Sequence, residues 1–105
     1  MKTLHLVLKG KWHDMIESGI KKEEYREIRP YWINRLCETA ADSGICSGDN
    51  RNYVEICHFD EVRFHRGYTN TTMEFRVKDI TIGIGKPEWG APDNKVFIIK
   101  LGDKL

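Results

Sequence analysis

The chain lacks a strong charge of either sign and any long apolar run. Its 105 residues include 17 Lys and Arg against 16 Asp and Glu, which gives a formal net charge of +1. Such a balance excludes a polycation that coats nucleic acid, so any nucleic-acid contact must come from a local patch. The longest apolar run covers only residues 96–99. This run is far too short for a helix that spans a membrane.

An export signal and a full set of cysteine pairs are also missing. The opening Met-Lys-Thr-Leu-His contains no apolar segment of the kind that a signal peptide needs. Three cysteines cannot all pair within one chain, and we expect them to be reduced thiols. These absences predict one cytoplasmic domain over residues 1–105 with no membrane partner.

Apolar periodicity predicts the elements of the first third of the chain. Leu4, Leu6 and Leu8 alternate with their neighbours, as in a strand. Helical spacing then predicts a short helix over 11–18, with Gly19 placed to end it. Pro30 is suited to the first position of a second helix, whose apolar side consists of Trp32, Ile33, Leu36 and Cys37.

The remaining two thirds favour strands. Residues 38–53 are mostly polar and predict a long loop insertion, followed by strand signals over 53–65. The alternation in 73–84 changes phase at Lys78–Asp79, which predicts a β-bulge that turns both halves toward one core. Residues 96–101 predict a central strand buried on both faces. The expected fold is α+β, a small, partly closed β-barrel with two short helices near the N-terminus.

The segment 21–28 carries charges at both strand parities. Lys22, Glu24 and Arg26 would share one face, and Glu23, Tyr25 and Glu27 the other. Such a strand must lie at the edge of a sheet, where charges deter aggregation, or line a polar cleft. Both interpretations stay open at this point.

Residues 6–26 resemble the opening of an ASCH domain, in which a strand and a helix precede the motif Gly-x-Lys-x-x-Glu-x-Arg. Here the motif positions are Gly19, Lys21, Glu24 and Arg26. The Trp-Gly-Ala-Pro loop and the closing Val-Phe-Ile-Ile-Lys-Leu-Gly strand are similar to small phage and bacterial members of that family. The resemblance covers nearly the whole chain and leaves 38–53 as an insertion.

This resemblance implies a PUA-like barrel whose cleft binds RNA or a modified nucleoside or nucleotide. Arg26 offers a planar fork for phosphate or a base edge, Lys21 a mobile charge, and Glu24 an acceptor for an exocyclic amine. The candidates for base stacking are Tyr25, Tyr31, Trp32 and Tyr68. Core packing is the alternative for each aromatic residue, and we favour it for Trp12 and Trp32 because both lie on apolar helix faces.

An enzyme using the same cleft is the second hypothesis. Some proteins of this fold are amidohydrolases on acylated cytidine, and they use a lysine and a threonine of the motif. Glu24 stands where that threonine would be, so the hydroxyl is missing, although Lys21 and Glu24 could still orient a water. A ribonuclease is a further possibility, and a protein–protein adaptor with no small ligand is a third class.

Two further groups are candidates for ligand contacts. Arg63, His65, Arg66 and Tyr68 suit phosphate contacts or form only a solvated turn. Trp89, between two prolines, either caps the core or forms the lip of the cleft, and we favour the lip.

The sequence gives no reason to expect a metal or another cofactor. The wide spacing of Cys37, Cys46, Cys57 and His58 lacks the close Cys-x-x-Cys pairing of zinc sites. His5 and His13 have no second ligand signal nearby, so we interpret both as ordinary residues.

Overall fold

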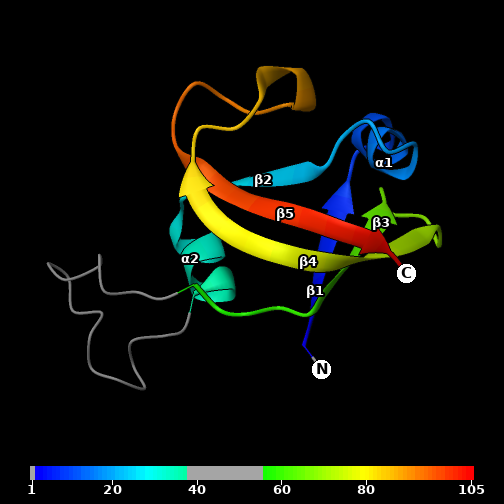
Figure 1. Ribbon diagram of the computed structural model, residues 1–105, viewed down its shortest axis with the longest axis horizontal. Helices are drawn as coiled ribbons and strands as arrows, with labels where there is room; N and C mark the ends of the chain where they lie inside the picture. Colours follow the sequence, from blue (N-terminus) through cyan, green and yellow to red (C-terminus); the bar gives the residue numbers. More distant parts are fainter. Residues whose placement is uncertain (1, 38–55) are drawn as a thin grey trace, which may run out of the picture.

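The computed structural model describes residues 2–37 and 56–105 (Figure 1). The expected insertion at 38–53 lies outside these described residues. The elements in chain order are β1 (Thr3–Leu8), α1 (Gly10–Glu17), β2 (Glu23–Glu27), α2 (Pro30–Leu36), β3 (Glu61–Arg66), β4 (Thr72–Gly83), a 3-10 turn η3 (Pro87–Trp89) and β5 (Val96–Lys104).

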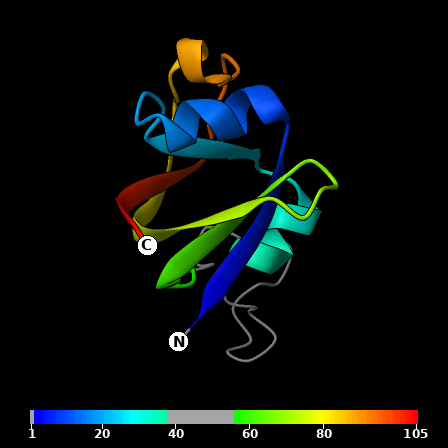
Figure 2. The same cartoon turned by 90° about the vertical axis from the view of Figure 1, so that its right-hand side faces the viewer.

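The strands form one five-stranded mixed sheet in the order β1-β3-β4-β5-β2. The β1–β3 pair is parallel and the other pairs are antiparallel. The sheet curls into a half-barrel, with β1 and β2 as its two edge strands (Figures 1 and 2). The predicted α+β class, partly closed barrel and two early helices are therefore confirmed. Among the described helices, none is long and apolar enough to cross a bilayer.

The N-terminal elements follow the predicted periodicity. Leu4, Leu6 and Leu8 of β1 are buried, and α1 ends just before Gly19, whose φ of +87° suits glycine. Pro30 occupies the first turn of α2, as expected. Apolar periodicity was sufficient to predict these elements, because the apolar side of each one packs directly against the core.

The phase change in β4 is a bulge. The pairing of β4 with β5 shifts between Phe75 and Val77 and again between Val77 and Asp79. Phe75 and Ile80 consequently both face the main core, which confirms the expected re-aiming. The expectation was wrong for Ile82 and Ile84, which are exposed. Ile82 is the second-last residue of β4, and Ile84 follows the end of the strand at Gly83.

The strand expected over 53–65 is shorter than the pattern indicated. Residues 53–55 lie outside the described part of the chain, and β3 begins only at Glu61. Asp60 instead lies in a bend before β3, and its carboxylate accepts a hydrogen bond from the backbone N–H of Lys2, next to the start of β1, at 2.8 Å. Cys57 is therefore a buried loop residue and not part of a strand.

Strand β5 separates two apolar clusters. Phe97 and Ile99 point into the main core, whereas Val96 and Ile98 point into a smaller second cluster with Tyr25 and Ala91. The predicted burial of this strand on both faces is confirmed. Because β2 pairs with β5, the charged 21–28 segment lies at an edge and yet between two apolar layers.

Candidate functional site

A cavity of about 870 Å³ opens between β2, α2 and the ends of β1 and β3. Three cations, Lys9, Arg26 and Arg35, line it against the two carboxylates of Glu24 and Glu27. The remaining lining residues are mainly aromatic, histidine or small: His5, Val7, Leu8, Trp12, Tyr25, Tyr31, Trp32, His65, Gly67, Tyr68 and Thr69. The cavity thus combines charged and aromatic groups.

The motif residues Lys21, Glu24 and Arg26 form one ion-pair network, which we call the β2 triad. Lys21 Nζ lies 3.0 Å from Glu24 Oε1, and Arg26 Nη1 donates to Glu24 Oε2. Lys21 is 1% exposed and Glu24 is 5% exposed. The expected convergence of these charges beside a concave surface is confirmed, and both earlier interpretations of 21–28 hold together. The segment is an edge strand that also lines a cleft.

Lys21, an expected ligand residue, does not line this cavity, and it connects Glu24 of β2 to the loop at 87–92. Its ammonium group donates a 2.7 Å hydrogen bond to the carbonyl of Trp89. The rings of Tyr25 and Trp12 lie 4.7 and 5.3 Å away, within cation–π range. Burial lowers the pKa of Lys21, and the charge of Glu24 opposes that change. Lys21 is therefore a fixed and partly desolvated cation.

Arg26 and Glu24 both line the cavity, and Arg26 is the more exposed of the two. It also donates hydrogen bonds to the carbonyls of Tyr25 at 2.8 Å and Val7 at 3.1 Å. Its guanidinium carbon lies 5.2 Å from the centre of the Trp32 ring. These contacts orient the planar donor group before any ligand arrives.

Tyr25 supports the triad from the opposite face of β2. Its hydroxyl donates to Glu23 Oε1 at 2.9 Å and accepts from the backbone N–H of Lys86 at 3.1 Å. Burial raises the pKa of the Tyr25 hydroxyl. The ring is only 7% exposed and packs in the second cluster, so it holds β2 in place and offers no open face for stacking.

Four other aromatic side chains line the cavity: Trp12, Tyr31, Trp32 and Tyr68. Tyr68 is fully exposed and Tyr31 is 63% exposed, so both rings are accessible. Trp32 packs against the main core, as expected, and also contributes to the cavity wall. Exposed rings at the rim and half-buried rings in the wall give a surface on which a planar base could stack.

Arg66 and Trp89, two expected ligand residues, lie outside this cavity. The guanidinium of Arg66 binds both carboxylate oxygens of Asp14 at 3.1 Å, which ties the end of β3 to α1. Trp89 packs on the second cluster under the ammonium of Lys86, and only its carbonyl reaches the triad. Trp89 therefore caps a core cluster, and our preference for the lip of the cleft was wrong.

The sequence analysis did not predict that two histidines of the cavity wall lie next to each other. His5 on β1 and His65 on β3 approach to 3.4 Å between Nδ1 and Nε2. Both residues line the cavity. The missing signal was the parallel pairing of β1 with β3, which no local pattern reveals.

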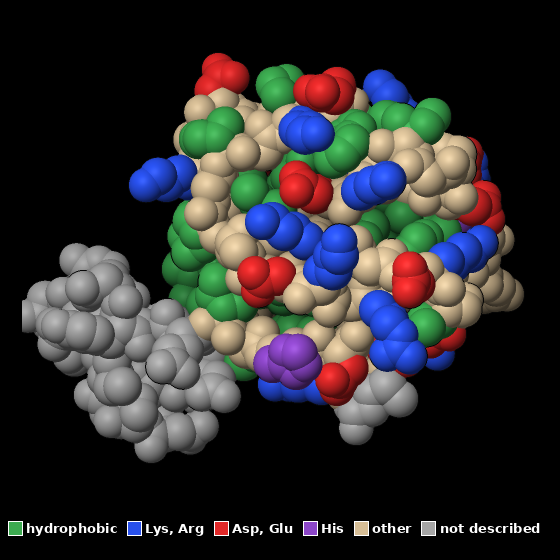
Figure 3. Space-filling model, in the orientation of Figure 1, with side chains coloured by type: hydrophobic (Ala, Val, Ile, Leu, Met, Phe, Trp, Pro, Cys, Tyr) green, Lys and Arg blue, Asp and Glu red, His purple; other side chains and the backbone are tan. Residues whose placement is uncertain are grey.

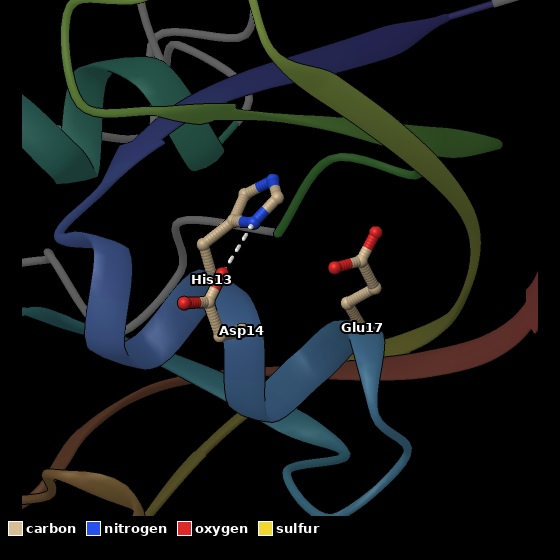
Figure 4. A group of neighbouring side chains, drawn as sticks. All are labelled: His13, Asp14 and Glu17. Atoms are coloured by element: carbon tan, nitrogen blue, oxygen red, sulfur yellow. Dashed lines mark ion pairs between the residues drawn. The ribbon is translucent and has the colours of Figure 1, made fainter.

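His13, Asp14 and Glu17 form a group of potential metal ligands on α1 (Figure 4). His13 is 1% exposed, and its Nδ1 lies 3.6 Å from Asp14 Oδ1. Arg66 already holds the Asp14 carboxylate, so a cation would have to displace a guanidinium. We interpret the group as a structural link between α1 and β3. Of the zinc candidates, Cys37 and Cys57 are core residues and Cys46 lies outside the described residues.

No family model, curated protein or solved structure matches the chain.

Proposed function

We propose that this chain is an ASCH-type, PUA-like domain that binds a nucleotide or a short single-stranded RNA segment in the cavity beside the β2 triad. The observation that carries the proposal is the burial of Lys21 and Glu24, with Arg26 extending from them to the cavity. The motif Gly19, Lys21, Glu24 and Arg26 supports the family assignment.

The burial of two charged groups, Lys21 and Glu24, next to the partly buried Arg26 needs an explanation beyond stability. Removing charges from water is expensive, and well-packed apolar residues of similar volume often stabilise a fold as well or better. The triad carries two cations and one carboxylate, so one positive charge remains at the cavity. Perturbed ionisable groups next to a cavity are a common property of binding and catalytic sites.

The cavity suits a phosphorylated nucleoside in size and chemistry. Its volume of about 870 Å³ lies within the usual range for small-molecule sites. Arg26 and the nearby Lys9 and Arg35 supply donors for phosphate, and the Tyr31 and Tyr68 rings are accessible to a base. Glu24 retains acceptor capacity beyond its two ion pairs, because a carboxylate offers about four lone-pair positions.

The surface favours a compact ligand over a long duplex. Figure 3 shows acidic and basic side chains interspersed over the face that it presents, with no continuous basic stripe there. Duplex binding normally uses many phosphate contacts and a broad basic footprint. A net charge of +1 fits a ligand with few phosphates better.

Hydrolysis of a modified nucleoside is the second candidate. The observation that favours it is the lowered pKa of Lys21, whose ammonium lies 3.0 Å from Glu24. Such a pair can hold and move a proton beside a bound water. Glu24 in place of a threonine means that water, and not a side-chain hydroxyl, would be the nucleophile.

The test is a binding screen that also measures turnover. Nucleosides, nucleotides, acylated cytidine and short RNAs are titrated by calorimetry, and the products are followed by chromatography. We expect saturable binding of at least one nucleotide-like compound and its loss in Arg26→Ala, while the matched surface variant Arg63→Ala binds as the parent does. Product formation would identify the enzyme. No binding to any member, or equal binding by Arg26→Ala, contradicts the proposal.

A further inference from the structure

The paired histidines of the cavity wall are the second notable constellation in the described chain. His65 lies opposite Val7 in the parallel β1–β3 register, and His5 is two residues before Val7. His5, Val7 and His65 therefore share the outer face of the sheet, while Leu6 and Phe64 point into the core. The sheet itself fixes the spacing of the two imidazoles.

The spacing is that of two ligands on one metal ion. His5 Nδ1 and His65 Nε2 are 3.4 Å apart, and the ring planes are inclined by 32°. Two imidazole nitrogens that bind one zinc tetrahedrally, each at roughly 2.0–2.1 Å, lie about 3.3 Å apart. The two nitrogens already have this separation. A bound ion would lie to one side of the line that joins them, so each ring would turn by roughly 35° to direct its lone pair at the ion, without a change in the spacing of the strands.

We propose that His5 and His65 bind one divalent transition-metal ion, such as Zn²⁺ or Ni²⁺, at the rim of the cavity. Imidazole is a preferred ligand of zinc, copper and nickel and a poor one for magnesium or calcium. In the metal-bound state His5 carries its proton on Nε2 and His65 on Nδ1, so that both lone pairs face the ion.

The ion would keep open coordination positions. In the described part of the chain, the only group of three or more neighbouring metal ligands is His13, Asp14 and Glu17 on α1. The histidine pair thus offers two protein ligands, and water fills the other positions. Both side chains line the cavity, so a phosphate or another anionic group bound there could replace one of these waters. This inference revises our sequence-based expectation that no metal binds.

The metal alone is the probe, so the test does not depend on nucleotide binding. Tag-free protein is titrated with Zn²⁺ and Ni²⁺ by calorimetry, and histidine nitrogens are followed by NMR in the parent protein. We expect one site with affinity in the micromolar range and shifts at His5 Nδ1 and His65 Nε2. His5→Gln and His65→Gln should each weaken binding about tenfold or more.

His58→Gln is the matched control, because His58 is an exposed histidine that pairs with Asp60 away from the cavity. This variant should bind the metal as the parent does. Metal binding that survives in both His5→Gln and His65→Gln overturns the proposal, as does the absence of binding by the parent. NMR shifts confined to His13 or His58 overturn it as well, and that readout requires no variant to fold.

Discussion

The β2 triad and the surface pair of Arg63 and Glu74 contain the same kinds of group in opposite surroundings. Arg63 donates to Glu74 Oε2 from Nη2 at 2.7 Å and from Nε at 3.1 Å. Those side chains are 42% and 36% exposed, whereas the side chains of Arg26 and Glu24 are 16% and 7% exposed. A guanidinium donates to a carboxylate in both, so solvent access decides what each contributes. The surface pair changes the free energy of unfolding very little. Burial of the triad costs desolvation free energy, which its ion pairs and hydrogen bonds must offset.

Removing the shared carboxylate should have the largest effect. Glu24→Ala leaves Lys21 and Arg26 without their common partner, and we expect a loss of about 3–5 kcal/mol in the free energy of unfolding. Urea denaturation measures this change. Glu74→Ala, which removes the carboxylate of the surface pair, is the control. Equal losses in the two variants would mean that burial does not distinguish the networks.

Replacing the whole triad tests whether it exists for stability. The combined variant Lys21→Met, Glu24→Leu and Arg26→Met removes all three charges while keeping approximate volume. We expect stability between unchanged and about 1–4 kcal/mol higher, together with complete loss of ligand binding. Thermal and urea unfolding give the first result, and calorimetry gives the second. A marked loss of stability would show that the triad is a structural requirement of the fold.

Tyr25→Phe isolates the support beneath the triad. It deletes two hydrogen bonds and should destabilise the fold by about 1 kcal/mol at neutral pH. Because the Tyr25 pKa is raised in the fold, the unfolded chain releases this proton first as pH rises above the ordinary value of 10.0. Folded protein then holds more protons than unfolded protein, and stability falls with pH.

The comparison of parent and Tyr25→Phe across alkaline pH gives the measurement. The parent should lose more stability above pH 10.0 than the variant does. The lowered pKa of Lys21 makes the free energy of unfolding rise with pH below pH 10.5, which is the opposite effect. Lys21 is present in both proteins, so its contribution cancels when the two pH profiles are subtracted. Parallel pH profiles would place the Tyr25 hydroxyl in water.

The smallest effect concerns the surface pair. A double-mutant cycle with Arg63→Ala and Glu74→Ala should give a coupling energy below about 1 kcal/mol, and it should shrink as salt is added. Urea unfolding at low and high salt provides both values. A coupling energy of several kcal/mol would show that the exposed pair contributes as much to stability as the buried triad does, which contradicts the comparison.

Local sequence pattern predicted where helices and strands lie, but it did not predict which strands pair with each other. The alternation of Leu4, Leu6 and Leu8 and the phase change at Lys78–Asp79 are properties of neighbouring residues, and both predictions are confirmed. The parallel pairing of β1 with β3 depends on the whole sheet, so the approach of His5 to His65 was not predictable. Sequence pattern specifies on which face of a strand a residue lies, whereas the pairing of strands specifies which distant residues lie beside it.

The same distinction applies within the candidate site. The motif correctly indicated that Lys21, Glu24 and Arg26 converge. Alternate residues of one strand share a face, which accounts for Glu24 and Arg26, whereas Lys21 precedes β2 and reaches Glu24 from three residues away. Arg66 and Trp89 were assigned from residue type alone. Their positions follow from Asp14 on α1 and from the second cluster, and neither contact has a signature in the adjacent sequence.

The route of the chain determines when this site can form. Among the strands that the structure describes, β2 pairs only with β5, and the bond from Lys21 to the Trp89 carbonyl joins residues 68 positions apart. Contacts of such long sequence separation close late, because loop entropy opposes them until the intervening segments are in place. A ribosome therefore makes the motif long before it makes the strand and loop that enclose the motif. Ligand binding should be the last property that the nascent chain acquires, and it reports that folding is complete.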